Sequence, residues 1–177
     1  MNETILNTRS AFSGKLIHVD LLETRLPDGN IGQRELVRHP GAVAIVALDA
    51  DENVLLVRQY RIGAEQSLLE IPAGTLEAGE DPAICADREL QEEASYKPGT
   101  LEALGGFYVA PGYTTEYIHL FLARDLTEAS LDADDDEFIS VEIMPLDSAL
   151  NLIDRGEIID GKTINGLLRV ARHLKQG

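Results

Sequence analysis

Two apolar segments in succession constrain the fold of this chain more than any other feature. Residues 42–48 and 54–60 are almost continuously apolar, and the acidic stretch between them, DADEN, is typical of a turn. A strand with one face in water alternates polar and apolar side chains, so two strands of this composition belong at the centre of a sheet. Both are far too short to span a bilayer, which takes about 20 residues.

Weaker patterns predict the remaining elements. Short strands are expected at residues 68–71, 101–109, 116–123 and 138–144, and helices at residues 82–94, 147–154 and 163–175. In the last helix an apolar stripe at helical spacing consists of Ile164, Leu167, Leu168, Ala171 and Leu174. The class is therefore α+β, with a mixed sheet sandwiched by helices.

The first forty residues form a region of their own in this prediction. Residues 15–25 and 31–39 are compatible with extended strands, and the sequence PDGN between them is typical of a turn. We expect a β-hairpin in a region 1–40, followed by the main domain over residues 41–177.

The charge of the chain excludes some classes of partner. A formal net charge of −16 and a pI near 4.5 argue against nucleic acid or an anionic membrane as the main partner. A phosphate-bearing substrate would need a local positive charge, which a divalent cation held by carboxylates can supply. The single cysteine, Cys85, lies in a helical pattern and is expected to be a buried apolar side chain. Nothing here requires an oxidising compartment, and residues 1–10 lack the pattern of a signal peptide, so a cytoplasmic location is expected.

The helix predicted at residues 82–94 carries the most informative side chains. Glu89, Glu92 and Glu93 are spaced i, i+3 and i+4, which places three carboxylates on one helical face. Such a cluster of hard oxygen donors suits Mg²⁺ or Mn²⁺, although a solvated acidic face with ion pairs has the same spacing. Arg88 can bridge to Glu80 or to Glu92 and so fix the carboxylates around it.

The segment GTLEAGEDPAICADRELQEEASY, residues 74–96, resembles the Nudix box. Its matching positions include Gly74, Glu80, Arg88, Glu89, Leu90, Glu92, Glu93 and Tyr96. The departure is Ser95, where the box has glycine; this position follows the helix, where a left-handed conformation is usual and serine costs about 1 kcal/mol.

Further segments are similar to the ADP-ribose pyrophosphatase branch of the Nudix hydrolases. They are HPGAVAIVAL, LLVRQYR, LLEIPAGTLEAGE, GFYVAPGYTTE, DDDEFISVE and DGKT, with Pro111 fifteen residues beyond Tyr96. The resemblance implies an α/β/α sandwich with a mixed central sheet and an N-terminal antiparallel hairpin sheet. It also implies Mg²⁺-dependent hydrolysis of ADP-ribose, or a related nucleoside diphosphate sugar, to AMP and ribose 5-phosphate.

The same resemblance implies roles for individual residues. Metal ligands would be Glu89, Glu92, Glu93 and the backbone carbonyl of Ala73, holding two or three Mg²⁺ ions, with Mn²⁺ as a substitute. The substrate would be contacted by Arg61 at the diphosphate, by Glu116 at the ribose, and by Arg38. The general base would come from the acidic loop 132–137, with Glu137 first and Asp135 second. Glu92 would position water or a second ion, and Gly74, Glu80 and Arg88 would have structural roles.

Other readings of the sequence remain open at this stage. The nearest is a hydrolase of GDP- or UDP-linked hexoses, and a non-catalytic ADP-ribose-sensing module would retain the same fold. An RNA-processing Nudix enzyme would need a basic patch with exposed aromatic residues, whereas aromatic residues make up 5% of this acidic chain. The N-terminal hairpin resembles the sheet that subunits of this branch exchange, so we expect a homodimer.

Overall fold

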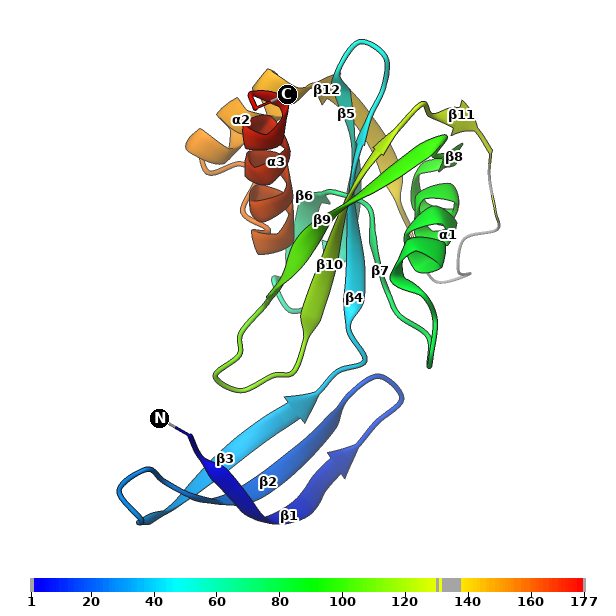
Figure 1. Cartoon of the computed structure of the whole chain (residues 1–177). Coiled ribbons are helices and arrows are strands. Elements are labelled where there is room, and N and C mark those ends of the chain that lie inside the picture. The colour runs from blue at the N-terminus through cyan, green and yellow to red at the C-terminus, as the bar shows by residue number, and fades with distance from the viewer. Residues whose placement is uncertain (1, 130, 132–137, 177) are drawn as a thin grey trace. The chain divides into compact units, whose positions relative to one another are not determined.

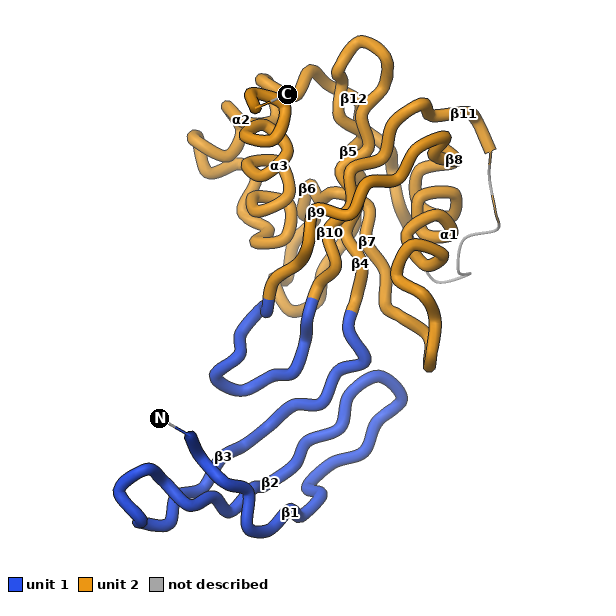
Figure 2. The backbone as a smooth tube through the Cα atoms, viewed as in Figure 1, with its two compact units in different colours: residues 1–41, 108–117 blue, residues 42–107, 118–177 orange. Residues whose placement is uncertain are grey.

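The computed structural model describes residues 2–129, 131 and 138–176. The chain divides into two compact units, coloured separately in Figure 2. Unit 1 contains residues 1–41 and 108–117, and unit 2 contains residues 42–107 and 118–177. The segment 108–117 therefore belongs with the N-terminal region, an association that the sequence did not predict.

Unit 1 is built on a three-stranded antiparallel sheet in the order β1-β2-β3. Its strands are β1 (Thr4–Ser13), β2 (His18–Arg25) and β3 (Ile31–Arg38). The hairpin of β2 and β3 confirms the prediction, and its turn uses Gly29 at φ +88°. Segment 108–117 joins this unit through the backbone of Val37, whose N–H donates to the Tyr113 carbonyl at 2.8 Å.

Strand β1 was not predicted from the sequence. All ten of its residues are exposed, including Ile5, Leu6 and Phe12. A strand with no buried face carries no burial pattern, so hydrophobic periodicity gives no signal for it.

Unit 2 has a mixed sheet in the order β12-β5-β4-β10-β9, with β6 paired to β5 and β7 paired to β4. β4 and β10 run parallel, whereas β5 is antiparallel to β4, β6 and β12. The two apolar segments form β4 and β5 near the middle of this order, as predicted. The strands are β4 (Ala42–Leu48), β5 (Asn53–Arg61), β6 (Gln66–Glu70), β7 (Ala73–Thr75), β9 (Thr100–Tyr108), β10 (Tyr117–Arg124) and β12 (Ser140–Pro145); β8 (Tyr96–Lys97) pairs with β11 (Thr127–Glu128).

Helices cover both faces of this sheet (Figure 1). On one face, α1 (Pro82–Ala94) packs its Cys85 and Leu90 against alternate residues of β4, among them Ile45. On the other face lie α2 (Leu146–Asp154) and α3 (Gly161–Leu174), whose buried residues join those of β4 that point the opposite way. Because β4 is buried along its whole length, its side chains enter both clusters. The predicted α/β/α sandwich is therefore confirmed.

One residue of the predicted stripe on α3 is placed differently. Leu167 is fully buried, and Ile164, Ala171 and Leu174 pack against the core. Leu168, however, is 52% exposed, and Val170 takes a fully buried position instead. The buried stripe therefore lies further round the helix, toward Val170 and away from Leu168. None of the helices in the described part of the chain is long and apolar enough to span a membrane.

Candidate active site

The start of α1 fixes the segment that carries the carboxylates. Asp81 is the N-cap, and its side chain accepts the Ala83 N–H at 2.8 Å, while Pro82 occupies the first turn. Both features favour a helix that begins here, because a cap oxygen satisfies a free N–H and proline has none to lose.

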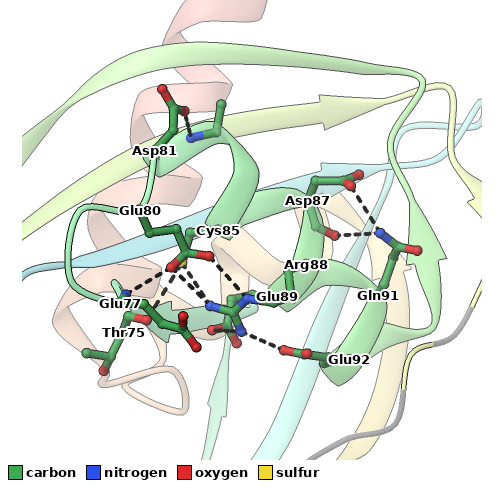
Figure 3. A network of polar contacts seen from close by, with 11 residues as sticks. Thr75, Glu77, Glu80, Asp81, Cys85, Asp87, Arg88, Glu89, Gln91 and Glu92 are labelled. Atoms are coloured by element: carbon green, nitrogen blue, oxygen red, sulfur yellow. Dashed lines mark hydrogen bonds and ion pairs between the residues drawn. The ribbon is translucent and has the colours of Figure 1, made fainter.

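Arg88 lies at the centre of a network of carboxylates (Figure 3). Its Nη1 donates to Glu89 and to Glu92, each at 2.8 Å, and its Nε and Nη2 each reach Glu80 at 3.3 Å. Burial lowers the pKa of Arg88, but the contact with Glu80 and the charge of Glu89 outweigh it and raise the net pKa above its ordinary value. Both bridges expected from the sequence are present, together with the contact to Glu89.

Glu93, on the same helix, is only 6% exposed. Its carboxylate accepts the Ala73 N–H at 2.8 Å and lies 3.4 Å from the Gln59 side-chain nitrogen. The helix is thereby tied to β7, the short strand that begins at Ala73.

Gly74 is required by the position of Glu89. A Cβ at residue 74 would lie 1.8 Å from the carboxyl carbon of Glu89. No side chain fits there while Glu89 keeps its place, so the structure gives this box position a steric reason.

The donor set is chemically suited to a hard divalent cation. Carboxylate and carbonyl oxygens are the ligands that Mg²⁺ prefers, and Glu89, Glu92, Glu93 and Ala73 all belong to the adjoining elements α1 and β7. Over residues 2–129, 131 and 138–176, no three His, Cys, Asp or Glu side chains are arranged as a ready ligand group. In this arrangement the single positive charge of Arg88 offsets only part of the charge of Glu89 and Glu92.

Arg61, at the end of β5, is part of a second charged group. Its Nε and Nη2 donate to the two carboxylate oxygens of Glu70 at 2.9 and 2.8 Å. Glu70 is 1% exposed and also contacts the ammonium of Lys162. Burial raises the pKa of Glu70, but the bonds from Arg61 and the charge of Lys162 outweigh it, so its net pKa lies below the ordinary value.

The sequence analysis assigned no role to Glu70 or Lys162. A glutamate inside the apolar segment LLEIP is a signal that was available, because a buried charge requires a partner. The partner could not be named from sequence, since Lys162 is 92 residues away along the chain.

The remaining predicted site residues are Arg38, Glu116, Glu137 and Asp135. Arg38 and Glu116 belong to unit 1, where Arg38 pairs with Asp20 at 3.0 Å and the Glu116 N–H donates to the Thr114 hydroxyl at 3.1 Å. The predicted bases, Glu137 and Asp135, lie outside the described residues.

Two further expectations about the box segment are confirmed. Ser95 follows the helix with φ 60° and ψ 34°, the left-handed conformation that the box glycine would adopt without strain. Cys85 is fully buried, and burial, followed by its contact with Glu80, raises the pKa of its thiol to about 12.

The NUDIX domain family matches residues 38–166 of the chain. The chain belongs to the Nudix family. It is 42% identical to a methanol dehydrogenase activator of Bacillus methanolicus and 39% identical to an ADP-ribose pyrophosphatase of Bacillus subtilis. Each of these alignments covers 92% of this chain and 89% of the relative. A crystal structure of an ADP compounds hydrolase matches with a TM-score of 0.88 and 25% identity, over 99% of this chain and 96% of that one.

Membership of the Nudix family agrees with the geometry around Arg88. Figure 3 shows Glu80, Glu89 and Glu92 gathered around Arg88, and the chain is a Nudix hydrolase. Nudix hydrolases generally use divalent metal ions, which is consistent with the oxygen donors on α1.

Proposed function

We propose that this chain hydrolyses the diphosphate of ADP-ribose to AMP and ribose 5-phosphate. The observation that carries the proposal is the carboxylate cluster around Arg88, which pairs with Glu80, Glu89 and Glu92. Gly74, which has no side chain, leaves room for Glu89. The likeness to a named ADP-ribose pyrophosphatase over 92% of the chain supports the choice of substrate.

The proposed cofactor is Mg²⁺, with Mn²⁺ as a substitute, bound as two or three ions. Glu89, Glu92, Glu93 and the Ala73 carbonyl would hold them. When bound, such ions neutralise phosphate oxygens and lower the pKa of a coordinated water. The protein contributes the fixed positions: Glu93 is held by the Ala73 N–H, and Arg88 keeps the neighbouring carboxylates in one cluster.

Three further roles complete the proposal. Arg61 would bind the diphosphate as a fork of donors, a geometry that guanidinium groups share with phosphates. Glu116 would contact the ribose, with Arg38 as a second substrate contact. A carboxylate of the acidic loop, Glu137 or else Asp135, would take the proton from the attacking water.

A panel of substrates tests this function. ADP-ribose, GDP-mannose and UDP-glucose are incubated separately with the protein and Mg²⁺, and the released mononucleotide is separated by chromatography. We expect AMP from ADP-ribose at the highest kcat/KM and no product in excess EDTA. Preference for a GDP- or UDP-linked hexose would reassign the substrate, binding of ADP-ribose without turnover would indicate a sensing module, and activity in EDTA would refute the metal assignment.

We also propose that the protein is a homodimer paired through unit 1. The fully exposed strand β1, with Ile5, Leu6 and Phe12 accessible, is an apolar surface of the kind that partner chains cover. Light scattering coupled to size exclusion should give twice 19.3 kDa, whereas a 19.3 kDa species at micromolar concentration would refute the dimer. A cytoplasmic location is proposed with it, on the basis of the single buried thiol.

A further inference from the structure

The proposed chemistry does not use the most deeply buried carboxylate near the site. Glu70 ends β6 and is 1% exposed, and its two cationic partners hold its pKa below the ordinary value despite the burial. It accepts two parallel hydrogen bonds from Arg61 and an ion pair from Lys162, so two cations share one anion. A buried carboxylate with such partners is costly to leave unpaired, which suggests that its contacts are persistent.

The pairing determines which part of Arg61 remains available. Glu70 occupies the edge formed by Nε and Nη2, and a guanidinium has five N–H groups in a rigid plane. The N–H groups of Nη1 therefore point away from Glu70. The side chain of Arg61 is 41% exposed and that of Glu70 is 1% exposed, so the carboxylate is the inner member of the pair and the guanidinium the outer one.

Lys162 is fixed by the start of α3. Its ammonium lies 3.2 Å from Asp160, the N-cap, and Asp160 in turn accepts the N–H and hydroxyl of Thr163 at 2.9 and 2.6 Å. The Thr163 oxygen accepts the N–H of Ile71, the residue after Glu70, at 2.9 Å. Glu70 is thus connected to the helix both by its side chain and through the next peptide group.

We propose that Glu70 is a positioning residue, which holds Arg61 and Lys162 as a preorganised pair of cations for the substrate diphosphate without touching the substrate itself. The inference rests on the proposed function, because it assigns the anion to the same site. Asp160 lies beside Lys162, so the two cations face two carboxylates and the group carries no excess charge. The gain lies in position, because side chains already fixed lose less conformational freedom when an anion binds.

The test is the Glu70→Gln variant with ADP-ribose and Mg²⁺. Glutamine keeps the size of the side chain but replaces one acceptor oxygen by a donor, which opposes Arg61 or Lys162. We expect KM to rise at least about 10-fold while kcat stays within about 3-fold, the pattern of lost binding rather than lost chemistry. Glu70→Asp retains the charge and should recover part of the KM.

Glu142→Gln is the matched control. It removes the carboxylate that pairs with Arg58 at 2.6 Å, on the same strand β5 as Arg61, and should leave KM unchanged. Should Glu70→Gln fail to fold, Lys162→Gln decides the question, because Lys162 is the second cation that Glu70 holds and has no other assigned role; its KM must also rise at least about 10-fold.

The outcomes separate this inference from the proposed function. An active wild type with an unchanged KM in Glu70→Gln, or in Lys162→Gln, overturns the positioning role alone. A fall in kcat with KM unchanged in Glu70→Gln also overturns it. A wild type that neither cleaves ADP-ribose nor binds its α,β-methylene analogue in calorimetry refutes the proposed function, and this inference with it.

Discussion

Gly74→Ala should abolish most of the activity while leaving the fold nearly intact. The added Cβ would lie 1.8 Å from the carboxyl carbon of Glu89, whereas real contacts of this kind are not closer than 3.0 Å. The carboxyl carbon must therefore move by about 1.2 Å, and a displacement of about 1 Å in a catalytic arrangement can cost about 100-fold in rate. We expect kcat for ADP-ribose to fall by about that factor.

The stability cost of the same substitution should be small. Gly74 does not have a positive φ, so alanine fits its backbone, and the obstructing group is the end of a flexible side chain. The loss of the contact between Arg88 and Glu89 contributes at most about 1 kcal/mol because the pair is partly solvated. In a chain of this size that corresponds to about 2–4 °C in Tm.

The assay compares kcat, Tm by calorimetry and Mn²⁺ affinity for the wild type, Gly74→Ala and Gly63→Ala. Gly63 lies in an exposed turn, and its added Cβ would meet nothing within 4 Å, so this variant should match the wild type. Near-wild-type turnover in Gly74→Ala would show that the position of Glu89 is not critical, and a collapse in Tm would show that the clash is absorbed by the backbone instead.

Other substitutions and conditions should have equally specific effects. Ser95→Gly should raise Tm by up to about 4 °C, because the left-handed conformation costs serine about 1 kcal/mol; an unchanged or lower Tm would contradict that strain. Cys85 should not react with a disulfide reagent at pH 8 unless urea is added, given its buried thiol and raised pKa; rapid labelling of the folded protein would contradict this. Because the folded pKa of Glu70 lies below its ordinary 4.5, its stabilisation is complete above about pH 5 and is lost as the pH falls through the folded value. Denaturant titrations should therefore show the wild type and Glu70→Gln converging in acid, and a constant difference would refute the linkage. Glu93→Gln should lower both Mn²⁺ affinity and kcat, the latter by at least about 100-fold, whereas Glu137→Gln should lower kcat alone and recover at high pH; wild-type turnover in Glu137→Gln would move the base to another carboxylate.

The sequence predicted the elements that have strong local signals. The bounds of α1 follow from its proline, its aspartate cap and the left-handed residue after it, and β4 and β5 follow from continuous apolar composition. The box residues on α1 were found together because they are neighbours on one helix.

What the sequence did not predict depends on contacts between distant residues or on exposed segments. Strand β1 has no buried face, so it differs from a polar loop only through its pairing with β2. Leu168 and Val170 are both apolar, and only packing against the sheet decides which of them is buried. The contact of Glu70 with Lys162 requires α3 to begin beside the end of β6, which no local pattern specifies.

The complete burial of β4 has a consequence for how unit 2 comes apart. One set of its alternate side chains packs with α1 and the other with α2 and α3, so neither cluster can open without exposing the strand shared by both. Local fluctuations that release a single helix leave the backbone amides of β4 still protected by the other. These amides are therefore expected to exchange with solvent only when the whole unit unfolds, which makes the two hydrophobic clusters a single cooperative core.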